Sequence, residues 1–160
     1  MSIDLDLVRD EAQTWRELLD TLRVLSPEEA ARPGYFEEGW SAKDALAHVG
    51  TWLAEAGVAL QQMHAGTYVE PPPEELDELN REFYDAMKDV PLADVRVQAA
   101  AARNRLLAEW VHVPADASDA AVAWIRKSGP EHYREHLPRL REWVKELRHT
   151  PAGERGPDRA

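Results

Sequence analysis

Two histidines stand four residues apart near the start of the last helix that the sequence predicts. His132 and His136 belong to the segment EHYREHLPRLREW, residues 131–143. Residues at i and i+4 share one helix face, so two imidazoles spaced in this way can bind one divalent ion together. A third ligand must come from elsewhere in the chain, and His48, in an upstream helical segment, is the best candidate. The residue types and their spacing therefore predict a metal site at His48, His132 and His136.

Three neutral imidazoles would leave open coordination positions on Zn²⁺, Ni²⁺ or Fe²⁺, which is typical of a catalytic rather than a structural site. The sequence does not choose among these metals. A site without metal stays open as the alternative, because HxxxH is a short pattern. Histidines at this spacing are often helix-surface residues or half-buried polar residues.

Acidic residues flank the candidate ligands. Asp44 lies one helical turn before His48 and could orient its second ring nitrogen, although helix capping is the favoured alternative. Glu131 and Glu135 could act as general bases beside an ion. On a helix both point about 100° away from the histidine face, so we expect them to be solvated.

Aromatic residues could form an apolar substrate pocket near the histidines. Trp52, Trp40 and Tyr133 are the main candidates, and Trp124 and Trp143 are further ones. The alternative is core packing, which is more common for aromatic residues at helical spacing. The remaining histidines, expected at the surface or at helix ends, are His64, His112 and His149.

Apolar residues recur every three to four positions over most of the chain, and no stretch is convincing as a strand. This periodicity predicts an all-α fold with helices over 8–24, 41–65, 74–88, 92–111 and 129–148. A short turn of helix follows Ser26, and residues 120–125 are ambiguous between a helical turn and an extended segment. Ser41 and Gly66 are the expected cap and stop of the second long helix, and Pro138 should kink the last one.

The length of 160 residues fits one domain, which we expect over 1–149. Residues 150–160 contain no apolar residue larger than alanine or proline, which predicts a disordered tail.

Charge and composition exclude several classes of partner. The net charge is −11 and would still be about −5 with all six histidines protonated, which opposes binding to a phosphate backbone. No apolar run is long enough to span a membrane, and the acidic N-terminus lacks the features of a signal peptide. We therefore expect a cytoplasmic protein with no nucleic-acid or membrane partner. Since the chain has no cysteine, any thiol in its chemistry must come from outside.

Three segments also carry a family resemblance. GWSAKDALAHVGTW (39–52) resembles the second-helix signature of the DinB-like four-helix bundles. The similarity is closest to the branch that holds the ClbS/DfsB self-protection proteins and the maleylpyruvate isomerase N-terminal domains. EHYREHLPRLREW resembles the last helix of these proteins, and ELNREFYD (78–85) with the helix after it also resembles that branch.

The resemblance implies an up-down-down-up four-helix bundle with short extra helices in a long crossover, residues 66–90. It implies that a divalent metal is held by His48, His132 and His136. The implied activity is that of a thiol-dependent transferase, an isomerase or a hydrolase acting on a small electrophile, with a low-molecular-weight thiol as cosubstrate. The alternative is a metal-free protein that binds or sequesters a small molecule in self-resistance. A homodimer is left open.

Overall fold

The computed structural model describes residues 4–36 and 39–149, and all the regular secondary structure in this part of the chain is helical. Its helices, with η for short 3-10 turns, are α1 (Leu5–Arg23), α2 (Pro27–Ala30), α3 (Ala42–Ala65), η1 (Pro73–Glu75), α4 (Leu76–Met87), α5 (Leu92–Trp110), η2 (Ala115–Ala117), α6 (Ser118–Ser128) and α7 (Pro130–His149). No strand occurs among these residues, so the predicted all-α fold is confirmed. The expected tail, 150–160, lies outside the described residues.

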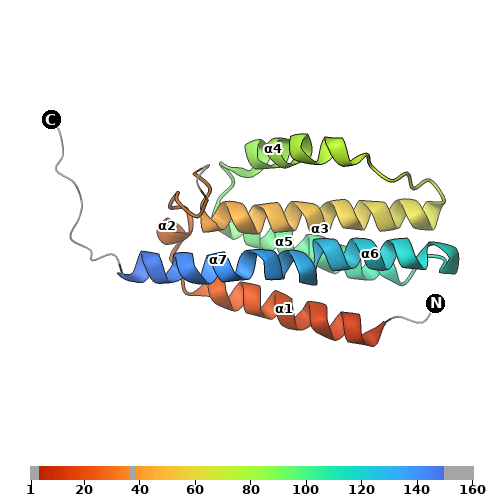
Figure 1. Ribbon diagram of the computed structural model, residues 1–160, viewed down its shortest axis with the longest axis horizontal. Coiled ribbons are helices and arrows are strands. Elements are labelled where there is room, and N and C mark those ends of the chain that lie inside the picture. Colours follow the sequence, from red (N-terminus) through yellow and green to blue (C-terminus); the bar gives the residue numbers. More distant parts are fainter. Residues whose placement is uncertain (1–3, 37–38, 150–160) are drawn as a thin grey trace.

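The long helices lie alongside one another (Figure 1). α3 packs against α5, α6 and α7, while α1 packs against α7. α6 and α7 follow each other almost in line, and α4 lies over α3 on the outside of the molecule (Figure 1). Followed along the chain in Figure 1, α1 and α7 run in one direction, and α3 and α5 run in the opposite direction.

α3 is the central helix, and its ends follow the sequence prediction. Ser41 and Asp44 form a capping box, in which the Asp44 amide donates to Ser41 Oγ at 3.1 Å and the Ser41 amide donates to Asp44 Oδ2 at 2.9 Å. The C-cap is Gly66, in the left-handed conformation. Within the N-terminal half of α3, a Cβ on Gly50 would lie only 2.9 Å from the Cβ of Ala99. A glycine here therefore lets α5 approach the backbone of α3 closely.

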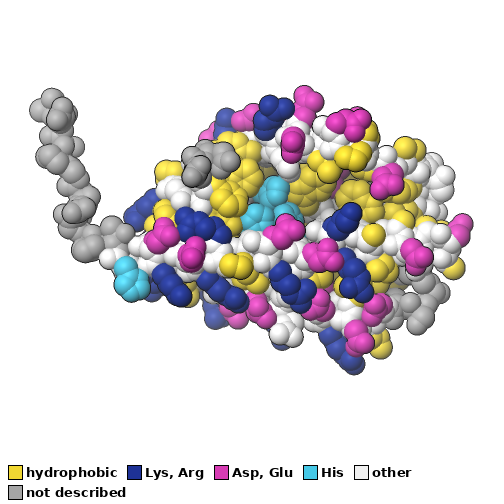
Figure 2. All heavy atoms as spheres, in the orientation of Figure 1, with side chains coloured by type: hydrophobic (Ala, Val, Ile, Leu, Met, Phe, Trp, Pro, Cys, Tyr) yellow, Lys and Arg dark blue, Asp and Glu magenta, His cyan; other side chains and the backbone are white. Residues whose placement is uncertain are grey.

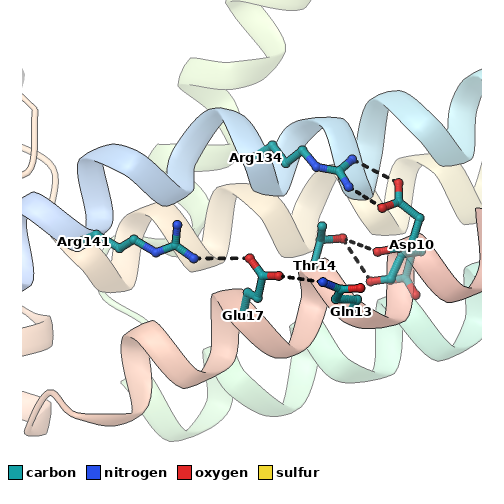
Figure 3. Close-up of polar contacts among 7 residues, drawn as sticks. Asp10, Gln13, Thr14, Glu17, Arg134 and Arg141 are labelled. Carbon is teal, nitrogen blue, oxygen red and sulfur yellow. Dashed lines mark hydrogen bonds and ion pairs between the residues drawn. The ribbon is translucent and has the colours of Figure 1, made fainter.

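Ion pairs join α1 to α7 along an exposed seam (Figure 3). Arg134 donates to Asp10 at 3.0 Å, and Arg141 donates to Glu17 at 3.2 Å. The two acidic residues on α1 are seven positions apart, and so are the two arginines on α7. Because the residue numbers increase in the same direction on both helices, α1 and α7 run parallel with matched turns. Exposed pairs of this kind each contribute little stability, and their main consequence is the register.

A buried ion pair lies between the same two helices and α5. Glu11 is only 2% exposed and accepts hydrogen bonds from Arg103 at 2.7 and 2.6 Å. It also accepts one from the Tyr133 hydroxyl at 3.0 Å, and the Tyr133 ring packs against Trp15. These contacts turn one face of α7 toward α1, which leaves another face for α3.

α4 covers α3 without entering the core, since none of its residues is buried. Lys43 holds its C-terminal end, donating to the carbonyls of Lys88 at 2.5 Å and Val90 at 2.9 Å. Just before α3, the Trp40 indole stacks on the Tyr84 ring with 5.4 Å between centroids. The crossover is therefore anchored to α3 from outside.

Residues 120–125, which the sequence left ambiguous, belong to α6. The break between α6 and α7 falls at Gly129, where a Cβ would lie 2.7 Å from the carbonyl oxygen of Ile125. α7 continues through Pro138, and a kink there stays a prediction. Within the described ranges, no helix is both long and apolar enough to cross a membrane.

Candidate metal centre

The three predicted ligands meet between α3 and α7. The ring centroid of His48 lies 4.9 Å from that of His132 and 5.5 Å from that of His136. One nitrogen from each ring can be chosen so that all three lie within 4.8 Å of one another. The predicted convergence is therefore confirmed for the side chains.

Helix geometry explains this meeting. His132 and His136 are one turn apart on α7 and each is 8% exposed, which places both on its inward face. His48 is half-buried in the second turn of α3, which packs directly on α7. His48 thus faces the pair from α3.

The rings have few polar partners besides one another. Nε2 of His136 lies 3.2 Å from Nε2 of His132, and Nδ1 of His136 lies 2.9 Å from the hydroxyl of Tyr35. The His132 ring hydrogen-bonds the backbone of Ser128. Nδ1 of His48 is buried with no hydrogen-bond partner among the described residues. An ion or an ordered water beside His48 would remove the cost of that unpaired nitrogen.

Burial keeps the three imidazoles uncharged at neutral pH. Loss of hydration lowers the pKa of His132 to about 3 and the pKa of His136 to about 4. The pKa of His48 falls to about 4 for the same reason, with a smaller contribution from the neighbouring His136. Burial also raises the pKa of the Tyr35 hydroxyl to about 12. Neutral rings have lone pairs available, which metal binding requires.

The donor set fits a divalent ion. Two nitrogens bound to tetrahedral zinc at about 2.0–2.1 Å would lie about 3.3 Å apart. The Nε2 atoms of His132 and His136 are 3.2 Å apart, close to that separation. A ring nitrogen of His48 also lies within 4.8 Å of a nitrogen of each of these two rings. The metal's identity does not follow from this geometry.

A cavity of about 580 Å³ opens beside His48 and His132. Its walls come from α3, α6, α7 and the crossover, and its lining includes Trp52, Tyr68, Leu76, Asn80, Trp124, Lys127 and Glu135. Figure 2 shows histidine side chains at the bottom of a hollow on this face, flanked by hydrophobic side chains. This volume is within the range of small-molecule sites.

Both indoles of the cavity already have polar partners. Trp52 Nε1 donates to Asn80 Oδ1 at 2.8 Å, and Trp124 Nε1 donates to the Tyr68 hydroxyl at 2.8 Å. Neither ring therefore needs a polar group from a bound molecule. The same bonds tie the crossover to α3 and α6 on both sides of the cavity.

A second cleft, of about 500 Å³, reaches His48 from the other side. Trp40, Asn80 and Tyr84 are among its lining residues, and the Trp40 ring lies 5.3 Å from the ring of His48. Trp52 and Trp40 thus each line a hollow that includes His48, and their role in binding a substrate stays a prediction.

Other expected site residues lie elsewhere. Tyr133 is fully buried and bonded to Glu11 toward α1, so its assignment to the substrate pocket is wrong. Trp143 packs against Arg139, away from the cavity.

The three acidic residues near the histidines, Asp44, Glu131 and Glu135, lie in different surroundings. Both oxygen contacts of Asp44 go to Ser41, and His48 Nδ1 has no partner in the described part of the chain. Asp44 therefore caps α3 and does not orient that ring. Glu131 and Glu135 are exposed, as expected, but Glu135 also lines the cavity beside His132.

The sequence did not predict two contacts, one between Tyr35 and His136 and one between His64 and His112. Tyr35 lies 101 positions before His136, in an irregular loop with no periodicity to mark it. His64 and His112, expected at the surface or at helix ends, stack on each other at the exposed ends of α3 and α5. Neither contact has a local sequence signal, since each depends on which helix ends meet.

Comparison with known proteins shows a shared fold and no assigned activity. No family model matches the chain, and no curated protein matches it. A solved structure of an uncharacterised protein from Escherichia coli UTI89 is similar, with a TM-score of 0.77 and 16% sequence identity. The match covers 90% of this chain and 94% of that one. At this identity the likeness concerns the helical fold alone.

Proposed function

We propose that this protein is a DinB-like, metal-dependent enzyme that acts on a small electrophile. The observation that carries the proposal is the group of three uncharged imidazoles, His48, His132 and His136, of which His48 and His132 line a cavity of about 580 Å³. Side chains able to hold an ion and space able to hold a small molecule adjoin each other there. Such a combination is the usual basis for a site hypothesis.

The helix arrangement supports the family part of this proposal. The parallel pair α1 and α7, opposed to α3 and α5, agrees with an up-down-down-up bundle. α4 and its flanking segments correspond to the long crossover between the second and third bundle helices. Residues of this segment, among them Tyr68 and Leu76, line the cavity beside His48 and His132.

The chain's own residues would bind and enclose the substrate. A bound divalent ion would act as a Lewis acid that polarises a carbonyl or activates a thiol or water. Trp52 and Trp124 would hold the apolar part of the substrate and exclude water. Glu135, on the wall beside His132, is the candidate proton acceptor. A thiol cosubstrate would have to enter from solution, since the chain has no cysteine.

A metal-free binding or sequestering protein is the second candidate. The observation that favours it is that His132 and His136 already satisfy each other and bond to Ser128 and Tyr35 without an ion. The cavity could then bind an apolar molecule without catalysis.

Metal analysis distinguishes the two candidates. Protein purified without chelators would be assayed for bound metal and then titrated calorimetrically with Zn²⁺ and Ni²⁺ after chelation. The enzyme proposal expects one ion per chain, lost in H132A/H136A and kept in the matched surface-histidine variant H64A/H112A. Transfer of glutathione to 1-chloro-2,4-dinitrobenzene would then be measured with and without metal. A wild-type chain that binds neither ion supports the sequestering candidate.

A further inference from the structure

The histidines form a hydrogen-bonded chain whose proton positions can be worked out. Nε2 of His136 and Nε2 of His132 are 3.2 Å apart, so one must carry a proton and donate while the other accepts. The backbone of Ser128 supplies the deciding constraint. Ser128 is the last residue of α6 and its amide is used within that helix, so the group that bonds the His132 ring is its carbonyl.

A carbonyl only accepts, so His132 must donate to it through the nitrogen that does not face His136, namely Nδ1. Nε2 of His132 is then unprotonated and accepts from Nε2–H of His136. That leaves Nδ1 of His136 unprotonated, and it accepts from the Tyr35 hydroxyl at 2.9 Å. In the metal-free protein the hydrogen bonds therefore run in one direction: Tyr35 donates to His136, His136 donates to His132, and His132 donates to the Ser128 carbonyl.

This order conflicts with metal binding at one atom. An ion between the rings needs the lone pair of His136 Nε2, which carries a proton in the metal-free chain. The ring can stay neutral and free that nitrogen only if its proton is on Nδ1 instead. Nδ1–H must then donate to its neighbour, the oxygen of Tyr35.

We propose that Tyr35 is a positioning residue that serves both states of His136. Its hydroxyl donates to Nδ1 in the metal-free protein and accepts from Nδ1–H when an ion binds at Nε2. The exchange releases no net proton, because Nε2 gives one proton to solvent and Nδ1 takes one from it. This inference rests on the metal site of the proposed function.

A hydroxyl suits this role because it both donates and accepts, whereas a carboxylate only accepts and an ammonium only donates. Tyr35 is also held firmly in place. It is 1% exposed, its amide donates to the Trp40 carbonyl at 2.9 Å, and its own carbonyl accepts from Arg139 at 2.8 Å. The loop therefore keeps the hydroxyl beside His136 while only its proton reorients.

Ring-nitrogen NMR tests the proposal. Long-range ¹H–¹⁵N spectra of the full chain would be recorded at pH 7.5 after chelation and again with one equivalent of Zn²⁺. Without metal, we expect His136 as the Nε2–H tautomer and His132 as the Nδ1–H tautomer. With zinc, His136 should change to Nδ1–H with a zinc-shifted Nε2. A His136 that keeps the same tautomer in both samples, or binds through Nδ1, overturns the proposal.

Two variants separate Tyr35 from a general packing effect. In the zinc form, the hydrogen-bonded Nδ1–H proton of His136 should be visible in wild type and lost or strongly shifted in Y35F. Y133F removes another buried hydroxyl, bonded to Glu11 on a different face of α7, and should leave that signal in place. An unchanged signal in Y35F refutes the role of Tyr35. If zinc shifts none of the three rings, the metal site itself is refuted, although the metal-free tautomers are still measured.

Discussion

Zinc should raise the thermal stability of this protein, because the three imidazoles meet only in the folded chain. An unfolded chain cannot hold His48 beside His132 and His136, so the ion stabilises the folded state alone. At free zinc one hundredfold above Kd, the gain in unfolding free energy is about 2.7 kcal/mol. For a domain of this size that corresponds to a rise in Tm of about 5–11 °C.

The pH dependence of this gain follows from burial. Histidines with an ordinary pKa of about 6.5 would release the ion progressively below that pH. Here the pKa values of His48 and His136 are lowered to about 4, and that of His132 to about 3. Protons therefore compete for the folded rings only near pH 4 and below. The rise in Tm should be almost as large at pH 5.5 as at pH 7.5 and should disappear toward pH 3.5.

The metal-free protein should begin to lose folding stability at a higher pH than the one at which the zinc effect disappears. Below pH 6.5 the unfolded histidines take up protons while the buried rings do not, so unfolding becomes more favourable as the pH falls. For one ring whose pKa drops from 6.5 to about 4, the loss accumulates to about 3 kcal/mol between these two values. Above pH 6.5 neither state is protonated, and this contribution no longer changes.

Circular dichroism melts of chelated protein, with and without zinc at pH 7.5, 6.0, 5.5, 4.5 and 3.5, would measure both effects. H132A/H136A should lose the zinc-dependent rise, and H64A/H112A should keep it, since the latter pair lies at the exposed ends of α3 and α5. The reasoning is refuted if zinc leaves the wild-type Tm unchanged, or if the rise survives in H132A/H136A. A rise that fades at pH 6 would refute the burial argument.

Three substitutions test the scaffold, each by urea unfolding. R103M should lower the free energy of unfolding by about 3–5 kcal/mol, because it leaves the Glu11 carboxylate buried without its cation. A decrease of less than about 1 kcal/mol would contradict this. G50A should destabilise by about 1–3 kcal/mol despite the better helix propensity of alanine, because the new Cβ meets Ala99. K43A should lower the free energy of unfolding by about 1–3 kcal/mol and speed amide hydrogen exchange in α4, because the carbonyls of Lys88 and Val90 lose their donor. Unchanged exchange would show that other contacts hold that helix.

The sequence by itself determined the local features of this protein. The three-to-four periodicity predicted the long helices, and the Ser41–Asp44 box and Gly66 marked the ends of α3. The spacing of His132 and His136 placed both on one face of α7. These features depend on hydrogen bonds and neighbours within one or two turns, so the residue order is sufficient to specify them.

Only the tertiary structure decided which helix faces meet. The sequence nominated His48 as the third ligand, but its distance from the pair depends on how α3 packs on α7. The same packing turned Tyr133 toward Glu11 and out of the pocket, and brought the loop residue Tyr35 to His136. Long-range contacts depend on the combined shape of many side chains, and no short pattern encodes them. The lowered histidine pKa values have the same origin, since burial is a property of the assembled core.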